Sequence, residues 1–390
     1  MRTNLRRILL VRGLYWTHFV AAVLVPFLRD WGGLTLLQIF VLNAWFMTWC
    51  LVFEVPTGVV ADRIGRKWSI VAGAVVTVAG CLVYVSAPGL TVFLVGDVLF
   101  GLGNSLVSGA DEALAYDSLV AAGEGHAAAR WLARLQAAQL VGIVVGALGG
   151  SVIASAWGLR APVALQAIPI ALAGVLASTL VEVAPANRRA TSGGFGAPLL
   201  AGVRWLRTTA HVRVVAADMV LVGALTWTLV WLYQPLLERA GVPRVAFGTV
   251  AAILCLAQAG VLHRLEWFVA VAGGRARYLR VAAAAAGVAM VALASSVRPP
   301  IVIGLLVLAM GLGLTRAPVA AAVLNAGMNP AERATTLSTI AMLRTLTVCL
   351  VNPIAGWLAD CSLGLAVGSL GLATLAVACL SPLRERHLAT

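Results

Sequence analysis

The sequence EVPTGVVADRIGRK, residues 54–67, decides the fold of this chain. A long apolar run ends within it, and a dense cluster of charged residues, from Asp62 to Lys67, follows at once. Charged side chains are costly in the hydrocarbon core of a bilayer, so this boundary is typical of a helix that leaves a membrane. The stretch therefore predicts a membrane-spanning helix that ends at about residue 61.

The composition of the whole chain agrees with a membrane protein. Of the 390 residues, 61% are hydrophobic and only 11% are charged, whereas soluble domains contain about 25% charged residues. Apolar runs of about 20 residues, the length of a helix that crosses a bilayer, recur from one end to the other. They predict an all-α membrane protein of about twelve spans, at 8–28, 36–61, 68–86, 92–115, 135–156, 162–181, 214–236, 245–263, 279–296, 300–325, 334–358 and 363–382.

The net charge of +13 is explained by membrane topology rather than by nucleic-acid binding. Cytoplasmic loops of membrane proteins carry an excess of Lys and Arg. With a cytoplasmic N-terminus, most arginines fall in the inside loops, and the opposite loops carry only Arg29, Arg160, Arg239, Arg244 and Arg298. The sequence thus predicts both termini in the cytoplasm, a multi-pass protein of the plasma membrane (the bacterial inner membrane) and no nucleic-acid partner.

A long loop divides the chain into two halves of similar length. Residues 182–213 are rich in Gly, Pro and Arg, and they separate an N-terminal six-helix bundle, 1–181, from a C-terminal six-helix bundle, 214–390. The halves share a faint similarity, in which Gly101–Gly103 aligns with Gly311–Gly313. Two parallel six-helix repeats with a site at their interface are a known transporter design.

The opening stretch also carries a family signature. Gly58-Val-Val-Ala-Asp62-Arg63-Ile-Gly65-Arg66-Lys67 resembles G-x-x-x-D-R-x-G-R-[KR], the motif between spans two and three of the major facilitator superfamily. The resemblance extends to the span count, the central loop and the repeat, and ERATTLS (332–338) looks like the family's start of span eleven. It implies the major facilitator fold, in which two bundles rock about a central site.

Two further segments bear on the branch of the superfamily. Gly142-x-x-x-Gly146-Ala-Leu-Gly149-Gly150 is similar to the glycine-rich motif of drug/proton antiporters, although the motif's proline is missing. The same GxxxG spacing also serves helix packing. The family's span-four motif R-x-x-x-G appears here as Asp97-Val-Leu-Phe-Gly101, so a carboxylate stands where the family carries an arginine.

The signature residues are expected to latch the two halves in one state of a transport cycle. Gly58 permits the close approach of a neighbouring helix, and Gly65 permits a tight turn. The resemblance implies that Asp62 meets the start of span eleven, where a helix N-terminus or an arginine would favour its charge. The alternative is that these charges only mark the cytoplasmic end of a span. The expected latch residues are Gly58, Asp62, Arg63, Gly65, Arg66, Lys67 and Arg344.

Span four carries a polar stripe through an apolar run. Asp97, Gly101, Asn104, Ser108 and Asp111 are spaced by three or four residues, so in one helix they share a narrow arc. Such a stripe is expected to face a cavity or a partner helix. Protonation of a cavity carboxylate, Asp97 first, would remove a costly charge and bias the conformational equilibrium; structural hydrogen bonds and interfacial helix ends are the alternatives. The proton-coupling candidates are Asp97, Asp111, Glu112 and Glu54.

The remaining candidates are cationic, aromatic and amide residues within the spans. Arg316 and Arg344 lie in apolar runs, and each is expected to pair with a carboxylate or to bind an anionic substrate. Asp218, at the start of span seven, is expected to be structural. The aromatic residues either mark membrane interfaces or form a surface for lipophilic or cationic compounds. The substrate-cavity candidates are Tyr15, Phe19, Asn43, Trp45, Trp49, Asn104, Ser108, Trp227, Trp231, Gln234 and Arg316.

Nothing in the sequence indicates an enzyme. It contains no HExxH, P-loop or GxSxG motif, and its six cysteines and five histidines lack metal-ligand spacing. No catalytic residue, metal or cofactor is therefore expected. The sequence predicts a monomeric, proton-coupled exporter of small lipophilic or drug-like compounds in the lipid bilayer. Uptake of a nutrient or organic anion by the same fold, or a non-transporting membrane receptor or assembly protein, are the alternatives, and the substrate and direction stay open.

Overall fold

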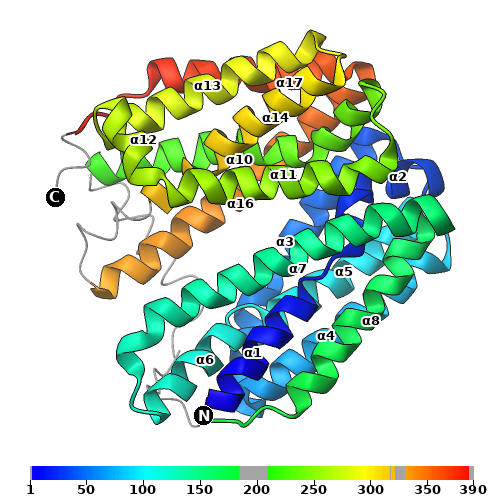
Figure 1. Ribbon diagram of the computed structural model, residues 1–390, viewed down its shortest axis with the longest axis vertical. Helices are drawn as coiled ribbons and strands as arrows, with labels where there is room; N and C mark the ends of the chain where they lie inside the picture. Colours follow the sequence, from blue (N-terminus) through cyan, green and yellow to red (C-terminus); the bar gives the residue numbers. More distant parts are fainter. Residues whose placement is uncertain (1, 184–209, 317, 321–329, 386–390) are drawn as a thin grey trace. The chain divides into compact units, whose positions relative to one another are not determined.

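The computed structural model of the chain describes residues 2–183, 210–316, 318–320 and 330–385 (Figure 1). All regular secondary structure in these ranges is helical. Eleven of the described helices are long and apolar enough to cross a membrane, and a bent pair at the N-terminus adds a twelfth if it counts as one span. The predicted all-α membrane protein is confirmed, while most of the predicted central loop, 182–213, lies outside the described residues.

The chain divides into two compact units. Unit 1 comprises residues 1–34, 45–192 and 244–252, and unit 2 comprises residues 35–44, 193–243 and 253–390. Two helices, α3 (Leu36–Ile64) and α11 (Phe247–His263), therefore contribute a segment to each unit. The division into bundles at 1–181 and 214–390 remains a prediction.

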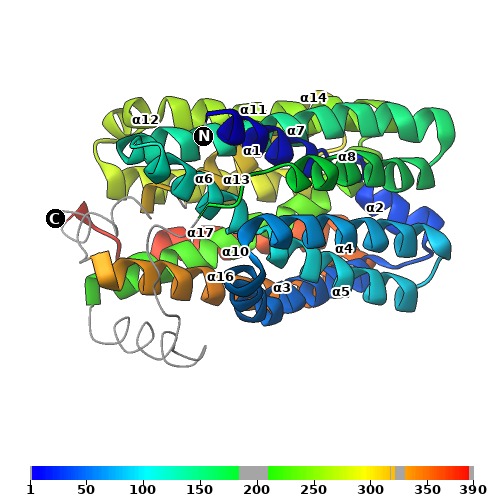
Figure 2. The same ribbon diagram turned by 90° about the horizontal axis from the view of Figure 1, so that it is seen from below.

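Small residues bring the helices of unit 1 close together, as is common in membrane proteins. Besides its part of α3 and α11, the unit contains α1 (Arg2–Tyr15), α2 (Leu24–Pro26), α4 (Arg66–Ser86), α5 (Leu90–Val107), α6 (Ala110–Ala121), α7 (Ala128–Trp157) and α8 (Arg160–Ser178). α4 lies beside α5 (Figure 2), and a Cβ atom at Gly73 would stand 2.8 Å from the backbone oxygen of Gly103. Any larger residue at Gly73 would push the two helices apart.

Unit 2 uses the same device between its own helices. It contains α10 (Ala210–Arg239), α12 (Leu265–Ala272), α13 (Arg275–Ser295), α14 (Pro299–Leu314), α16 (Pro330–Cys361) and α17 (Leu363–Leu380). α13 lies beside α17 (Figure 1), and a Cβ atom at Gly371 would stand 2.8 Å from the backbone oxygen of Gly287. The two helices therefore meet at backbone distance.

The first span is not the continuous helix over 8–28 that the sequence predicts. α1 ends at Tyr15, a short 3-10 helix covers Phe19–Ala22, and the segment up to Trp31 is bent by 59° from the first part. The irregular backbone lies directly on the glycine-rich run of α7, where a Cβ atom at Gly146 would stand 2.5 Å from the backbone nitrogen of His18. The glycines of α7 thus make room for the break. Helix packing therefore explains the glycine-rich run without a role as an antiporter motif.

The fourth span is also broken, and this changes where its polar residues point. α5 ends at Val107 and α6 begins at Ala110, with Gly109 between them at a φ of +77°. This left-handed conformation is strained for residues with a side chain, and glycine adopts it freely. Asp111 therefore belongs to α6, and the prediction of one arc that unites it with Asp97 is wrong.

Candidate functional site

The signature loop is held by two carboxylates that lie far away in the sequence. Gly65 has a φ of +96°, and α4 begins directly after it. The backbone N–H groups of Arg66 and Lys67 donate to the carboxylate of Glu182 over 2.9 and 2.8 Å. The Arg66 guanidinium forms an ion pair with Asp117 of α6. The predicted tight turn at Gly65 is present, and its anchors are residues that the sequence did not single out.

Unit 2 repeats this arrangement. Gly274 has a φ of +132°, and the backbone N–H groups of Ala276 and Arg277 donate to Glu385 over 2.8 and 3.3 Å. A carboxylate that follows the last helix of the unit thus caps α13, as Glu182 caps α4. Gly-Arg-Lys at 65–67 and Gly-Arg-Ala-Arg at 274–277 thus form corresponding turns within the two units.

The remaining latch residues show no partner in the described part of the chain. Asp62 and Arg63 are exposed, and no described atom lies within 4 Å of a Cβ atom placed at Gly58, so the close approach expected at Gly58 is not seen. The expected partner segment is 332–338, and the side chains of residues 332–337 lie outside the described part of the structure. Glu54 and Arg344 are both ionisable residues within apolar runs, so the sequence also suggests that they pair. This pairing and that of Asp62 with Arg344 remain predictions.

Unit 1 contains a cavity of about 420 Å³ between α1, α5, α6 and α7. Tyr15 and Trp16 supply its aromatic wall. The other lining residues, most of them polar, are Arg12, Asn104, Val107, Ser108, Gly109, Glu112, Gln136 and Gln139. Four substrate or coupling candidates therefore come together here, namely Tyr15, Asn104, Ser108 and Glu112.

Arg12 organises the polar side of this cavity. It is buried, and its Nη1 atom lies 2.6 Å from Oδ2 of Asp111. Its Nη2 atom donates to Gln139 over 2.7 Å and lies 3.3 Å from Oε1 of Glu112, which also accepts from Gln136 over 3.2 Å. One guanidinium faces two carboxylates, so the cluster carries one negative charge in excess.

The sequence analysis counted Arg12 among the arginines of the inside loops, and its set of substrate-cavity candidates did not include Trp16, Gln136 or Gln139. A signal for Arg12 exists, because it lies inside the first apolar run and a cation there needs a carboxylate partner. The partner comes from 99 residues further along the chain. No periodicity within one helix identifies such a pair.

Asp97 lies away from this cavity lining. It is buried, with 5% of its surface exposed, and it accepts a hydrogen bond from the hydroxyl of Tyr84 in α4. The rings of Phe93 and Phe100 surround that tyrosine, each with its centroid 4.9 Å from the tyrosine ring. The stripe of span four thus meets a partner helix at Asp97 and a cavity at Asn104 and Ser108.

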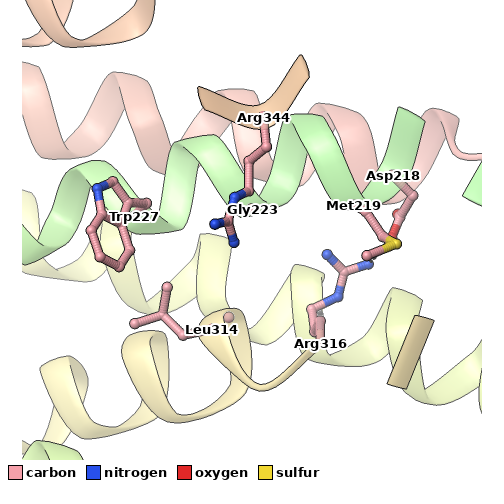
Figure 3. Close-up of a pocket in the computed structure, with 8 residues that line it drawn as sticks. Asp218, Met219, Gly223, Trp227, Leu314, Arg316 and Arg344 are labelled. Atoms are coloured by element: carbon pink, nitrogen blue, oxygen red, sulfur yellow. Dashed lines mark hydrogen bonds and ion pairs between the residues drawn. The ribbon is translucent and has the colours of Figure 1, made fainter. Parts of the chain in front are cut away.

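Unit 2 contains a smaller pocket between α10, α14 and α16 (Figure 3). Nη2 of Arg316 lies 2.5 Å from Oδ2 of Asp218, and both residues are buried. Nε of Arg316 donates to the backbone oxygen of Leu279 over 2.8 Å. The prediction that Arg316 pairs with a carboxylate is confirmed, whereas Arg344 shows no ion pair among the described residues. Asp218 is thus the partner of Arg316, and Trp227 also lines the pocket.

The other substrate candidates do not line either cavity, and most of them pack against or bond to other residues of their own unit. Phe19 lies on Gly149 of α7. Trp45 donates to the backbone oxygen of Leu94, and Asn43 accepts a hydrogen bond of 2.7 Å from Asn352 within unit 2. The remaining candidates in this group are Trp49, which stacks on Phe53, Gln234, which donates to Tyr233, and Trp231. No group of three potential metal ligands occurs in the described ranges.

Comparison with known families decides the identity of the fold. The family profile of the Major Facilitator Superfamily matches residues 8–349. The chain belongs to this superfamily. It is a secondary transporter and not an enzyme, and the resemblance carried by residues 58–67 is confirmed at the level of the superfamily.

Solved structures of major facilitator proteins share the fold over the full length. A mutant of the nucleoside transporter NupG has a TM-score of 0.80 at 12% identity, over 100% of this chain and 99% of that chain. A bacterial homologue of the human lysosomal transporter Spinster, inward-facing and unoccupied, has a TM-score of 0.75 at 14% identity, over 99% and 96%.

The D-xylose-proton symporter has a TM-score of 0.72 at 15% identity, over 97% of this chain and 96% of that chain. At such low identities these likenesses concern the fold alone. None of the three supports the drug/proton antiporter branch in particular. No curated protein sequence matches the chain.

Proposed function

We propose that this transporter carries a small polar solute through the cavity of unit 1 by alternating access. The observation that carries the proposal is the lining, in which Arg12, Asn104, Glu112 and the two glutamines outnumber the apolar side chains. Ligand sites use a few placed polar groups to fix orientation and provide specificity. Solute binding at these groups favours a polar compound that forms several hydrogen bonds.

Export of lipophilic compounds, the hypothesis drawn from the sequence, is the second candidate. Tyr15 and Trp16 favour it because they offer an aromatic surface on one wall. An apolar compound would offer no hydrogen bond to the donors and acceptors of the opposite wall that the protein itself does not occupy, at a cost in free energy. Uptake of a polar nutrient accordingly takes precedence over export of a lipophilic compound.

Proton coupling is assigned here to Glu112 before Asp97. Glu112 is half-buried and lines the cavity, and its cluster holds one negative charge in excess. A proton on Glu112 neutralises that excess, and the occluded, water-poor state of the cycle then holds no uncompensated charge within the bilayer. Asp97 accepts a hydrogen bond from Tyr84 and does not line the cavity, so it ranks second for proton coupling.

The membrane orientation follows the distribution of arginines. We place both termini in the cytoplasm and the chain, as a monomer, in the plasma membrane, because Arg-rich loops stay inside. The exposed apolar residues on the helices, such as Val141, Val152 and Leu372, then contact lipid.

The test uses the purified protein in liposomes with an internal pH reporter and a panel of polar and lipophilic solutes. A polar solute is expected to be accumulated when a pH gradient is imposed. Ser108→Leu, which places an apolar side chain in the cavity, should lower its transport at least about tenfold. The matched control is Ser155→Leu on the exposed face of α7, which should transport normally. Transport of lipophilic compounds alone would contradict the proposal.

A further inference from the structure

Each unit contains a buried ion pair of arginine and aspartate. The arginine comes first along the chain in unit 1, and the aspartate comes first in unit 2. In unit 1 the arginine, Arg12, comes from α1 and the aspartate, Asp111, from α6. In unit 2 the aspartate, Asp218, comes from α10 and the arginine, Arg316, from the segment after α14. The hydrogen bonds of the two aspartates can therefore be compared directly.

The pair in unit 1 is saturated. Oδ2 of Asp111 accepts from Arg12, and Oδ1 accepts from the backbone N–H of Glu112 over 2.8 Å. The other nitrogens of Arg12 donate to Gln139 over 3.1 and 2.7 Å. Each oxygen of this carboxylate therefore has a partner within the protein, so Asp111 presents no unpaired buried oxygen to a ligand.

The pair in unit 2 is not saturated. Oδ1 of Asp218 is buried and has no hydrogen-bond partner among the described residues. A buried polar atom without a partner costs about 1–3 kcal/mol, so its persistence needs an explanation. The residue is 4% exposed and lines the pocket, which provides the explanation if a ligand group donates to this oxygen.

A second cation faces the same pocket. The side chain of Arg344 extends from α16 past Gly223 toward the space above Leu314 (Figure 3). Its stem lies on α10, since a Cβ atom at Gly223 would stand 3.4 Å from Cδ of Arg344. Arg344 is exposed, and no carboxylate forms an ion pair with it in the described ranges. Two guanidinium groups thus face one carboxylate, which leaves one positive charge in excess.

We propose that this pocket binds the carboxylate head of a small organic acid that carries a hydroxyl or ammonium group on the neighbouring carbon. Arg344 holds the carboxylate, because a planar guanidinium matches a carboxylate with two hydrogen bonds. Oδ1 of Asp218 accepts from the neighbouring hydroxyl or ammonium group. Arg316 holds Asp218 in place through their ion pair.

The size of the pocket limits what enters it. Its volume of about 20 Å³ is little more than the roughly 10–15 Å³ needed for one water molecule, so only the hydroxyl or ammonium group enters it to reach Asp218, and the carboxylate binds at its mouth, beside the exposed Arg344. The rest of the solute extends past the exposed side of Arg344. This inference rests on the proposed transport function and names the class of the solute, a 2-hydroxy or 2-amino acid. A proton on Glu112 and a 2-hydroxy acid anion at Arg344 would then move together without net charge, whereas a proton and a zwitterionic 2-amino acid would carry one positive charge.

The experiment measures binding rather than transport, so that the two proposals fail separately. The unfolding midpoint of the purified full chain is recorded with lactate, mandelate and glycine, and with propionate and lactamide as comparisons. Lactate, mandelate or glycine should raise the midpoint in a saturable way, by about 2–4 °C at high occupancy. Propionate lacks the donor for Asp218 and should act more weakly, and uncharged lactamide should have no effect.

Variants locate the binding. Arg344→Gln should weaken acid binding at least about tenfold, Arg344→Lys should restore part of it, and Asp218→Asn should abolish the preference for lactate over propionate. Arg239→Gln is the matched control, because Arg239 donates to the backbone oxygens of Leu293, Ala294 and Ser296 in the same unit. It should lower the midpoint and leave the acid-induced shift unchanged.

Three results would overturn the inference: no acid in the panel shifts the midpoint, lactamide acts as strongly as lactate, or Arg344→Gln responds like the wild type. Transport that remains sensitive to Ser108→Leu in any of these cases leaves the proposed function intact. Acid binding that depends on Arg344 without transport of any solute supports the pocket and contradicts the proposed function.

Discussion

The carboxylate of Glu182 accepts a hydrogen bond of 2.8 Å from the backbone N–H of Lys67. These two residues lie 115 positions apart, and the bond ties the beginning of α4 to the segment that follows α8. Because the first N–H groups of a helix have no partner within the helix, Glu182 completes α4. The family signature thus depends on a residue outside it.

Replacement of Gly65 should be among the most damaging single changes in the signature. Its φ of +96° and ψ of 150° fall in a region that glycine alone adopts readily, and a Cβ atom would stand 2.9 Å from Oε2 of Glu182. Gly65→Ala should therefore lower the free energy of unfolding by about 2–4 kcal/mol, through about 1–3 kcal/mol of backbone strain and the loss of the cap.

The control is Gly33→Ala, where φ is +72° and a Cβ atom meets nothing within 4 Å. Glu182→Gln should cost about 0.5–2 kcal/mol, the usual range of a helix cap. Unfolding titrations in mild detergent give both values. Equal effects of Gly65→Ala and Gly33→Ala would show that the contact with Glu182 contributes nothing.

Asp62 should matter for transport and not for folding. It is exposed and has no ion pair in the described part of the chain, so Asp62→Asn should leave the unfolding midpoint unchanged. If the family latch operates, the variant still loses at least about tenfold in transport rate, because one state of the cycle is less stable. Asp117→Asn, which deprives Arg66 of its partner, should instead reduce stability. Normal transport kinetics in Asp62→Asn would leave the residue as a topological signal.

The two buried ion pairs should respond differently to removal of both partners. Arg316→Met alone leaves Asp218 charged and unpaired, at a cost of about 3–5 kcal/mol. Arg316→Met together with Asp218→Leu should cost clearly less, because no buried charge remains.

The corresponding double variant of Arg12 and Asp111 should stay destabilised, since Gln139 and Glu112 also bond to Arg12. Double-mutant cycles from unfolding titrations measure both couplings. Equal coupling energies in the two units would argue against the difference described above, in which both oxygens of Asp111 have partners and Oδ1 of Asp218 has none in the described residues.

Neutralisation of Glu112 and neutralisation of Asp97 should have different effects on proton-driven accumulation of the solute. Glu112→Gln should abolish accumulation against a gradient and retain downhill exchange, because the cavity no longer takes up a proton. Asp97→Asn keeps a hydrogen-bonding partner for Tyr84 and should retain most of the accumulation. Solute counterflow with and without a pH gradient distinguishes these outcomes. If Asp97→Asn loses accumulation and Glu112→Gln does not, the assignment drawn from the sequence stands and the present one is wrong.

Topology is tested with reporter fusions after residue 390 and within 182–213. Both should report a cytoplasmic location, since twelve spans return the chain to its starting side. A reporter after Gly89, between α4 and α5, is the control and should lie outside. A reversed pattern would contradict the orientation and leave the fold unaffected.

The sequence predicted what depends on local pattern. Apolar length predicted the spans, and the motif at residues 58–67 predicted the superfamily. The break at Gly109 had a local signal, because Ser-Gly is a common turn sequence, but the period of the polar stripe concealed it. The break after Tyr15 had none within its own span, since its cause is the glycine-rich face of α7.

The pairs that build the site could not be predicted in this way. Arg12 meets Asp111 and Arg66 meets Asp117 through the packing of separate helices. Every carboxylate of the chain was available as a partner, and burial alone does not choose among them. Arg316 was recognised as needing an acid, and only the three-dimensional arrangement named Asp218.

The interruption at Ser108 and Gly109 implies that the cavity of unit 1 is hydrated. Both residues are exposed and line it, and backbone groups freed from a helix persist at membrane depth only inside protein or beside water. A solute that enters therefore exchanges places with water molecules. Its affinity reflects how well its own donors and acceptors replace those of the displaced water, so the transporter selects its cargo by substitution for solvent rather than by the filling of an empty space.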